Sequence, residues 1–151
     1  MSMTETLVLA VDIGTSSVRA LVFDQGGRIR ARRQRLYTTI RPEPYFEEQD
    51  PDLVRTEVFA AIRDLLSGGE VAAGDIAALG FSSQMYGIFP VDGEGRALAN
   101  SIIWSDGRAE AQAGRIKEEM GPLGFYPDTG CPANSIYPVA KLAWLKEKRA
   151  E

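Results

Sequence analysis

The first apolar run of the chain ends at one aspartate and resumes after a short, hydroxyl-rich turn. Residues 7–11 are too few and too rich in β-branched side chains for a helix, and residues 18–23 alternate, so both segments are predicted strands. Asp12 therefore lies where the first strand becomes a loop. The pattern predicts a hairpin whose turn consists of Gly14, Thr15, Ser16 and Ser17.

A third strand and a helix are expected next. The turn 24–27 precedes a predicted strand at 28–37, which gives three consecutive antiparallel strands. After a proline-containing connection at 41–49, Asp50 is the expected N-cap and Pro51 the first residue of a helix that ends at Gly68 and Gly69. Its apolar residues fall on one stripe and predict packing across the sheet: Val54, Val58, Ala61, Ile62 and Leu65.

The second half of the chain is predicted as further strands and helices. Gly121 and Pro122 are expected to end the first of these helices. This order of elements predicts an α/β fold of the ribonuclease H-like kind, with a mixed sheet and flanking helices. Strands are expected at 76–81, at 87–91 before a turn at 92–95, and at 101–104, with helices from 105–107 to Met120 and from Pro138 to Glu151.

Composition indicates one ordinary globular domain. The 151 residues carry 17 basic and 21 acidic side chains, and a net charge of −4 argues against a nucleic-acid partner held by counterion release. The arginines in 28–35 alternate as on the solvent face of a strand, and a basic patch for phosphate or nucleic acid is the alternative. No run is long enough to span a membrane and no basic segment precedes residue 7, so we expect a cytoplasmic protein.

The absence of histidine removes several kinds of catalytic site. A Ser-His-Asp triad, a Cys-His pair and a zinc site containing histidine all need that residue. Cys131 is the single cysteine, so a disulfide within the chain is excluded as well. We interpret Cys131 as a small structural side chain.

The turn after Asp12 has the composition of a phosphate-binding loop. Gly14 lacks a Cβ, so backbone N–H groups of the turn can approach one anion. An ordinary tight turn is the alternative, because glycine and serine are common there. A negative carboxylate beside a site for a negative phosphate is favourable only if a cation lies between them. We therefore expect Mg²⁺ near Asp12.

Four motifs follow one another along the chain: V-D-I-G-T-S-S-V-R-A at 11–20, P-Y-F-E-E-Q-D-P at 44–51, G-F-S-S-Q-M-Y-G at 80–87 and I-I-W-S-D-G-R at 102–108. In this order they resemble the FGGY family of carbohydrate kinases. The resemblance covers nearly the whole chain, but only the front part of such an enzyme, which has two ribonuclease H-like domains of the actin-like ATPase and sugar kinase type. Residues 1–151 then form the N-terminal part of the first domain.

The resemblance implies ATP and Mg²⁺ as cofactors. It assigns Asp12 to the metal and to the ATP phosphates, together with the turn that follows it. For Arg19, a role in bracing the turn or facing solvent stays open beside the cofactor role. The implied cofactor-binding residues are Asp12, Gly14, Thr15, Ser16, Ser17 and Arg19.

The resemblance places Gln84, Met85 and Tyr86 at a sugar pocket. Xylulose-type members resemble this segment with Gln-Met-His, whereas glycerol-type members carry Arg-Glu at the last two positions. The chain therefore departs from both, which argues against glycerol and leaves a sugar or another polyol as the expected small-molecule substrate. The alternative is that Met85 and Tyr86 only fill the core.

Trp104, Asp106 and Arg108 are the second implied part of the pocket, since an aromatic ring beside a carboxylate and a guanidinium suits a sugar. The structural alternative is that Trp104 fills the core and Asp106 caps the following helix. A looser match extends to Asn134, Ser135 and Tyr137.

The aspartate that serves such kinases as general base lies in a later segment, beyond Glu151. No catalytic residue is therefore expected within the chain, and residues 1–151 are expected to be an N-terminal fragment that is inactive alone. A non-catalytic sugar-binding or regulatory module is the second hypothesis. A nuclease is a weak third, because it needs clustered acidic residues and 81–83 offer none. A homodimer stays open.

Overall fold

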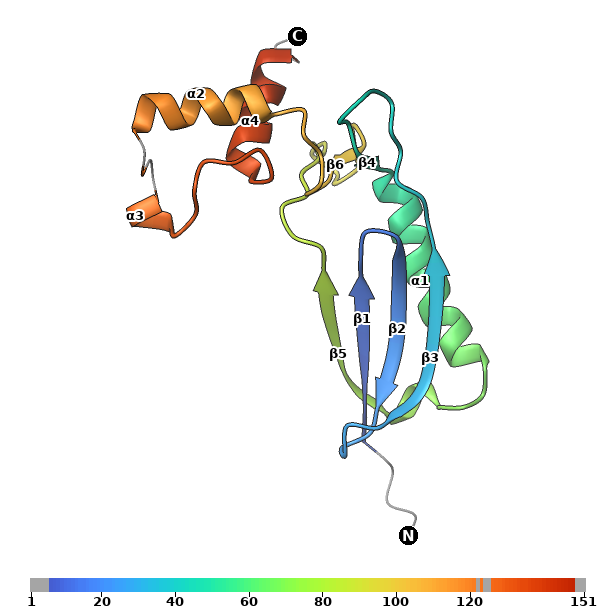
Figure 1. The fold of residues 1–151 in the computed structure, drawn as a ribbon. Coiled ribbons are helices and arrows are strands. Elements are labelled where there is room, and N and C mark those ends of the chain that lie inside the picture. Colours follow the sequence, from blue (N-terminus) through green and yellow to red (C-terminus); the bar gives the residue numbers. More distant parts are fainter. Residues whose placement is uncertain (1–5, 122, 124–125, 149–151) are drawn as a thin grey trace. The chain divides into compact units, whose positions relative to one another are not determined.

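The computed structural model describes residues 6–121, 123 and 126–148 and divides into two compact units. The first unit contains residues up to Thr38 and Pro51–Gln84, and the second contains Thr39–Asp50 and the residues from Met85 onward. Figure 1 shows the elements of both. Among the described residues, no helix has the length and apolar character needed to cross a membrane.

In its described residues, the first unit contains a four-stranded mixed sheet with helix α1 (Pro51–Ser67) on one face. Strands β1 (Leu7–Ile13), β2 (Ser17–Phe23) and β3 (Ile29–Leu36) are antiparallel neighbours, as the alternation predicts. Strand β5 (Ile76–Ser83) lies parallel to β1, which gives the order β3-β2-β1-β5. The predicted mixed sheet is confirmed, and among the described strands β5 forms one of its edges.

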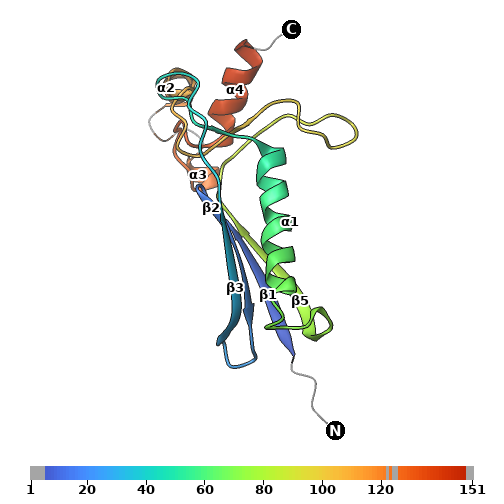
Figure 2. The same cartoon turned by 90° about the vertical axis from the view of Figure 1, so that its right-hand side faces the viewer.

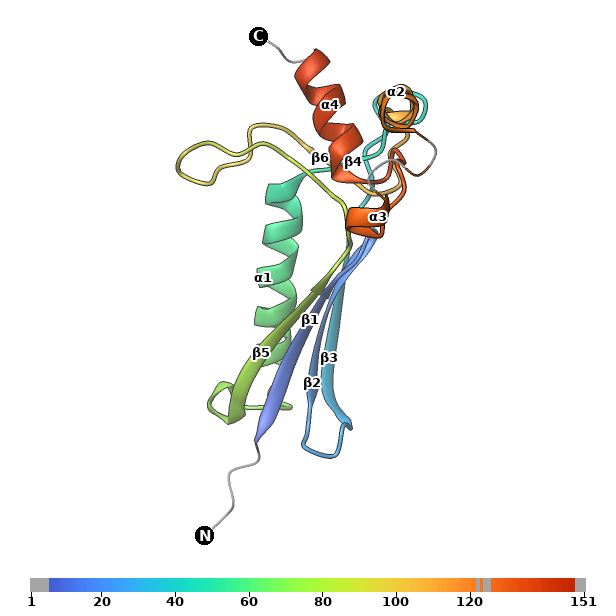
Figure 3. The ribbon, with the colours of Figure 1, turned by 90° about the vertical axis from the view of Figure 1, so that its left-hand side faces the viewer.

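Helix α1 (Pro51–Ser67) packs on one face of this sheet, against β2 and β3 (Figures 2 and 3). The predicted apolar stripe faces the sheet, since Val58, Ala61 and Leu65 are buried and Val54 and Ile62 pack beside them. The helix begins at Pro51 and ends before Gly68 and Gly69, as predicted, and Gly69 adopts a φ of 73°. The N-cap role of Asp50 stays a prediction. The short helix η1 (Ala73–Asp75) then leads into β5.

Strand β5 has an apolar sequence but is mostly exposed. Its burial is intermediate at Ile76 and the seven residues after it are exposed, including Leu79 and Phe81. A continuous apolar run of this kind is typical of a strand covered on both faces. The exposed side chains therefore form an apolar surface on the first unit.

The second unit contains less regular structure than expected. Strands β4 (Glu48–Gln49) and β6 (Ser101–Ile102) form a two-stranded sheet, and the strand predicted at 87–91 is wrong. That segment has isolated bridges, Ile88 with Ile102 and Val91 with Ala97. Pro90 lies within this segment and has no backbone N–H to donate to a ladder, and only single bridges form on either side of it.

The described part of the second unit also contains three helices, of which α2 (Glu110–Met120) packs against α4 (Pro138–Lys148). The short helix α3 (Tyr126–Thr129) was not predicted. Helix α2 begins later than predicted, and its N-cap is Ala109 without a side-chain hydrogen bond, so the capping role considered for Asp106 is wrong. The last predicted helical residues, 149–151, lie outside the described residues.

Candidate functional site

Asp12 lies at the end of β1 and pairs with Arg19 across the hairpin. The two residues are opposite each other in the antiparallel register, and an Arg19 guanidinium nitrogen lies 3.1 Å from Asp12 Oδ2. Both side chains are about half exposed, at 42% for Asp12 and 51% for Arg19. An exposed ion pair contributes only about 1 kcal/mol or less, so a ligand with stronger charge can exchange for either partner.

The turn itself is closed by its own backbone. The Gly14 N–H donates to the Ser17 carbonyl at 2.9 Å, which means that this amide serves the turn rather than an outside anion. Ser16 is exposed, whereas Ser17 is buried at the start of β2. An incoming phosphate therefore meets Ser16 before Ser17, and the cofactor roles of both residues stay predictions.

Tyr37 hydrogen-bonds to the hairpin turn, and it was not identified from the sequence as a site residue. Its hydroxyl donates to the Gly14 carbonyl at 2.5 Å, and its backbone N–H donates to the Ser16 carbonyl at 3.1 Å. Burial raises the pKa of Tyr37, and the negative charge of Asp12 raises it further. The feature of the sequence that could have indicated its role is an aromatic residue directly after the arginine-rich strand.

Gln84, from the predicted sugar motif, contacts the hairpin turn within the first unit. Its backbone N–H donates to the Ile13 carbonyl at 2.9 Å, and the Thr15 hydroxyl donates to its Oε1 at 3.4 Å. The parallel strands β1 and β5 end at the same edge of the sheet, and ligands in open α/β sheets bind at such carboxyl ends. The structure therefore brings a residue predicted for the substrate beside a residue predicted for the nucleotide.

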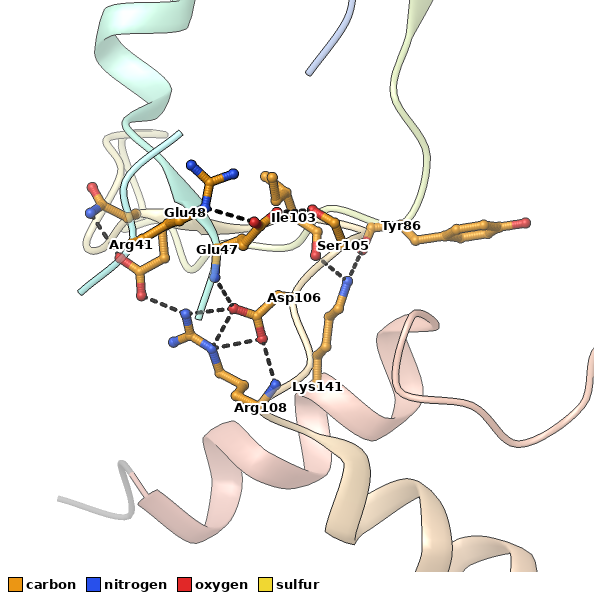
Figure 4. A network of polar contacts seen from close by, with 10 residues as sticks. Arg41, Glu47, Glu48, Tyr86, Ile103, Ser105, Asp106, Arg108 and Lys141 are labelled. Carbon is orange, nitrogen blue, oxygen red and sulfur yellow. Dashed lines mark hydrogen bonds and ion pairs between the residues drawn. The ribbon is translucent and has the colours of Figure 1, made fainter. Parts of the chain in front are cut away.

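Asp106 and Arg108 form the centre of a buried polar network in the second unit (Figure 4). The Arg108 guanidinium donates to Asp106 and, at 2.7 Å, to Glu48. Asp106 also accepts the backbone N–H of Glu47 at 2.6 Å. The side chain of Arg108 is 3% exposed and that of Asp106 is fully buried. Their substrate role stays a prediction, and in this structure both groups serve contacts within the unit.

Aromatic rings cover Arg108. Its guanidinium carbon lies 3.9 Å from the centre of the Phe46 ring and 5.0 Å from that of Trp144, and the two rings meet edge to face. Burial alone would lower the pKa of Arg108, but its hydrogen bonds to Asp106 and Glu48 outweigh this effect and raise it. The cation is therefore fixed in its charged form.

A cavity of about 620 Å³ opens beside this network. Glu47 lies at its wall, bonded to the Ser105 hydroxyl and to Arg41, and these contacts lower the pKa of its carboxyl, the bond from Ser105 most strongly. The lining consists of residues 41–47, Ser105 and Gly107.

The remaining predicted pocket residues are more open to solvent. Met85 is 65% exposed and Trp104 is 45% exposed, so neither is a core residue in this structure. Tyr86 has a positive φ of 62°, and its ring packs against that of Tyr137 with 4.9 Å between the centres. The weaker match at Tyr137 is thus brought to Tyr86 by the fold.

Two other residues of that weaker match have partners within the chain. Ser135 donates to Glu110, and the Asn134 side chain accepts the Ile136 N–H.

No role was assigned to Lys141 from the sequence, because it looks like an ordinary surface lysine on a helix. Its side chain is fully buried, and Nζ donates to the carbonyl groups of Tyr86 and Ile103, each at 2.8 Å (Figure 4). Burial lowers the pKa of Lys141 to about 8, against an opposing effect of Asp106. The signal in the sequence was its position on the stripe of α4 that also carries Trp144.

No group of three or more histidine, cysteine, aspartate or glutamate side chains in the described part of the chain is arranged to hold a metal ion. Among the described residues, Asp12 therefore belongs to no cluster of three such ligands. Magnesium is usually bound through one or two carboxylates, with water and substrate phosphates supplying the remaining oxygens, so this donor set fits Mg²⁺ brought with a nucleotide.

Comparison with known proteins agrees with the geometry. The model of the N-terminal domain of the FGGY family of carbohydrate kinases matches residues 7–151. A glycerol kinase of Methylibium petroleiphilum is 37% identical over 141 residues, covering 93% of this chain and 28% of that protein. A gluconokinase of Bacillus subtilis is 30% identical over 146 residues, covering 95% of this chain and 28% of that protein. The chain thus spans about 28% of the length of these relatives.

Solved structures give the same fold. Xylulose kinase from Lactobacillus acidophilus aligns with a TM-score of 0.87 and 30% identity, over 96% of this chain and 29% of that one. Plasmodium falciparum glycerol kinase, solved with ADP, aligns with a TM-score of 0.84 over 95% of this chain and 29% of that one, but at 20% identity supports the fold alone.

Proposed function

The chain belongs to the FGGY family of carbohydrate kinases, and we propose that it is the N-terminal part of a kinase that transfers phosphate from ATP to a hydroxyl group of a sugar or polyol. The observation that carries this proposal is the contact between Thr15 and Gln84 at the carboxyl edge of β1 and β5. It joins one predicted nucleotide residue, Thr15, to one predicted substrate residue, Gln84, within the first unit.

On the nucleotide side, the hairpin supplies the groups that phosphoryl transfer needs. Asp12 would hold Mg²⁺ through water or directly, and Ser16 and Thr15 would hydrogen-bond phosphate oxygens. Arg19 neutralises Asp12 until the cation arrives. The hairpin residues would position the transferred phosphate, whose charge a bound cation would help to neutralise. Positioning and electrostatics account for most of the catalysis in this reaction class.

On the substrate side, some residues would contact the substrate and others would support them. Gln84, Tyr86 and Trp104 offer an amide, a phenol and an aromatic face, which suit hydroxyl groups and the apolar C–H face of a sugar. Asp106 and Arg108 lie in the buried network of the second unit and would support rather than touch the substrate. The relatives include glycerol, gluconate and xylulose kinases, so each of these compounds is a candidate.

The test is an ATP-consumption assay of the full-length protein against glycerol, gluconate and xylulose. We expect one of them to be phosphorylated, and Trp104→Ala to raise its KM while leaving the KM for ATP nearly unchanged. Glycerol as the preferred substrate would contradict the prediction made from Gln84-Met85-Tyr86. Sugar binding without ATP consumption would instead support the non-catalytic module, and phosphorylation by residues 1–151 alone would show that the general base had been misplaced.

A further inference from the structure

We infer that Lys141 is a positioning residue of the substrate region, which fixes the segment of Tyr86 against the segment of Trp104 by bonding one backbone carbonyl in each. This inference rests on the proposed function, since it concerns the same pocket. Lys141 touches neither substrate nor nucleotide in this role, and acts through the two segments that it joins.

The geometry of the ammonium group supports this role. Nζ donates to the Tyr86 carbonyl and to the Ile103 carbonyl at 2.8 Å each, although these residues lie 55 and 38 positions away in the chain (Figure 4). Ile103 directly precedes Trp104. One side chain from α4 therefore bonds to both predicted walls of the pocket, and all three residues belong to the second unit.

A backbone bridge already joins the same two segments. The N–H groups of Ile88 and Ile102 donate to each other's carbonyls at 3.1 and 2.8 Å. The fold of this region is thus not made by Lys141 alone. In addition, Lys141 fixes the backbone just beyond the bridge, at Tyr86 in one segment and next to Trp104 in the other.

Tyr86 is the residue that most needs such control. Its φ of 62° is in the left-handed region, which costs a residue with a side chain about 1 kcal/mol or more. The Lys141 bond holds the carbonyl of this residue, and Tyr137 packs on its ring. Without the bond, the backbone of Tyr86 is free to relax to negative φ, which would move its ring from its place against Tyr137.

A buried ammonium is a costly way to fill space. Burial disfavours the charged form, as the lowered pKa of about 8 shows, and an apolar side chain of similar length would pack there without that cost. The charged groups that act on it are Asp106, which favours the cation, and Arg108, which opposes it. Two charge-assisted hydrogen bonds to carbonyls are the gain that offsets this cost.

The experiment compares Lys141→Met with Lys146→Met in the full-length protein, since Lys146 is exposed on the same helix. Misplacing a binding group slightly costs up to about a hundredfold, so we expect Lys141→Met to raise the KM for the sugar about tenfold or more. The KM for ATP should stay within about twofold, as for Lys146→Met. In the unmodified protein the sugar KM should also rise as the pH passes about 8, and this dependence should vanish in Lys141→Met.

A sugar KM that is unchanged in Lys141→Met, or a KM for ATP that rises equally, overturns the inference. If Lys141→Met does not fold, the pH dependence of the unmodified protein decides the question. Failure of the proposed function is distinguishable, because then no sugar gives a KM in the unmodified protein. Lys141 is then tested by the ¹³C signal of the Tyr86 carbonyl, which accepts the Lys141 bond and must shift on titration through about pH 8; a constant signal refutes the positioning role.

Discussion

The Thr15 hydroxyl donates to Gln84 Oε1 at 3.4 Å across 69 residues of sequence. Gln84 is also tied to the turn through its backbone, by the bond from its N–H to the Ile13 carbonyl. A change at one of the two side chains should therefore be felt at the other.

We expect Thr15→Val and Gln84→Ala to be non-additive. Each removes one partner of the same hydrogen bond, and residues in contact couple by about 0.5 kcal/mol or more. The measurement is a double-mutant cycle on kcat/KM for the sugar in the full-length protein. Thr15→Ser keeps the hydroxyl and is the control, expected to preserve the coupling. Strict additivity of Thr15→Val and Gln84→Ala would falsify a functional contact.

Asp12→Asn should separate activity from stability. The ion pair with Arg19 is half exposed, so its loss should change the free energy of unfolding by less than about 1 kcal/mol. Loss of the carboxylate near the metal should lower kcat about a hundredfold or more. Asp52→Asn breaks the exposed pair with Arg55 on α1 and is the matched control, with normal kcat expected. A normal kcat in Asp12→Asn would remove this residue from the metal site.

Stability at alkaline pH should depend on Tyr37. The raised pKa means that the folded chain holds the phenol proton more tightly than the unfolded chain, whose value is 10.0. The stabilisation by Tyr37 is therefore complete below pH 10 and is lost as the pH rises through the folded value. Urea unfolding of the unmodified chain and of Tyr37→Phe should differ by about 1 kcal/mol near pH 8, and by less above pH 10.

The comparison residue for Tyr37 is Tyr45, whose side chain is exposed. Tyr45→Phe should unfold like the unmodified chain at both pH values. If the difference in unfolding free energy between the unmodified chain and Tyr37→Phe stays constant from pH 8 to above pH 10, the raised pKa of Tyr37 is contradicted.

Arg108→Ala should be strongly destabilising. It leaves the fully buried Asp106 carboxylate without its guanidinium partner, and removing one member of a buried ion pair costs about 3–5 kcal/mol. Urea unfolding measures this loss. The exposed pair of Arg115 with Glu147 supplies the control, and Arg115→Ala should cost less than about 1 kcal/mol. Equal losses in the two variants would mean that the network contributes no more than a surface pair.

The first unit was largely predictable because its signals are local. Alternation around Asp12, the hydroxyl-rich turn and the stripe of α1 each identify an element within a few residues of sequence, and the sheet and helix follow. The edge strand β5 was predicted for the same reason. What local pattern could not give was that Tyr37 lies under the turn, since this depends on the register between β2 and β3.

The second unit was less predictable because its contacts are distant in sequence. The segment 87–91 reads as a strand but has only isolated bridges, and Lys141 reads as a surface lysine but is buried by Tyr86 and Ile103. The motif residues Asp106 and Arg108 were recognised, whereas the ion pair of Arg108 with Glu48 was not. Composition and periodicity indicate whether a residue type is usually buried or exposed. Lysine is usually exposed, so the buried Lys141 is an exception that they do not predict.

The exposed strand β5 has a practical consequence for handling these 151 residues. Its run Ile76-Ala77-Ala78-Leu79-Gly80-Phe81 carries no charge, and an open edge of this kind is a template on which another extended chain can add. Self-association through β5 should therefore compete with folding when the polypeptide is concentrated. A lysine at position 79 or 81 would be the first change to make before crystallisation or NMR is attempted.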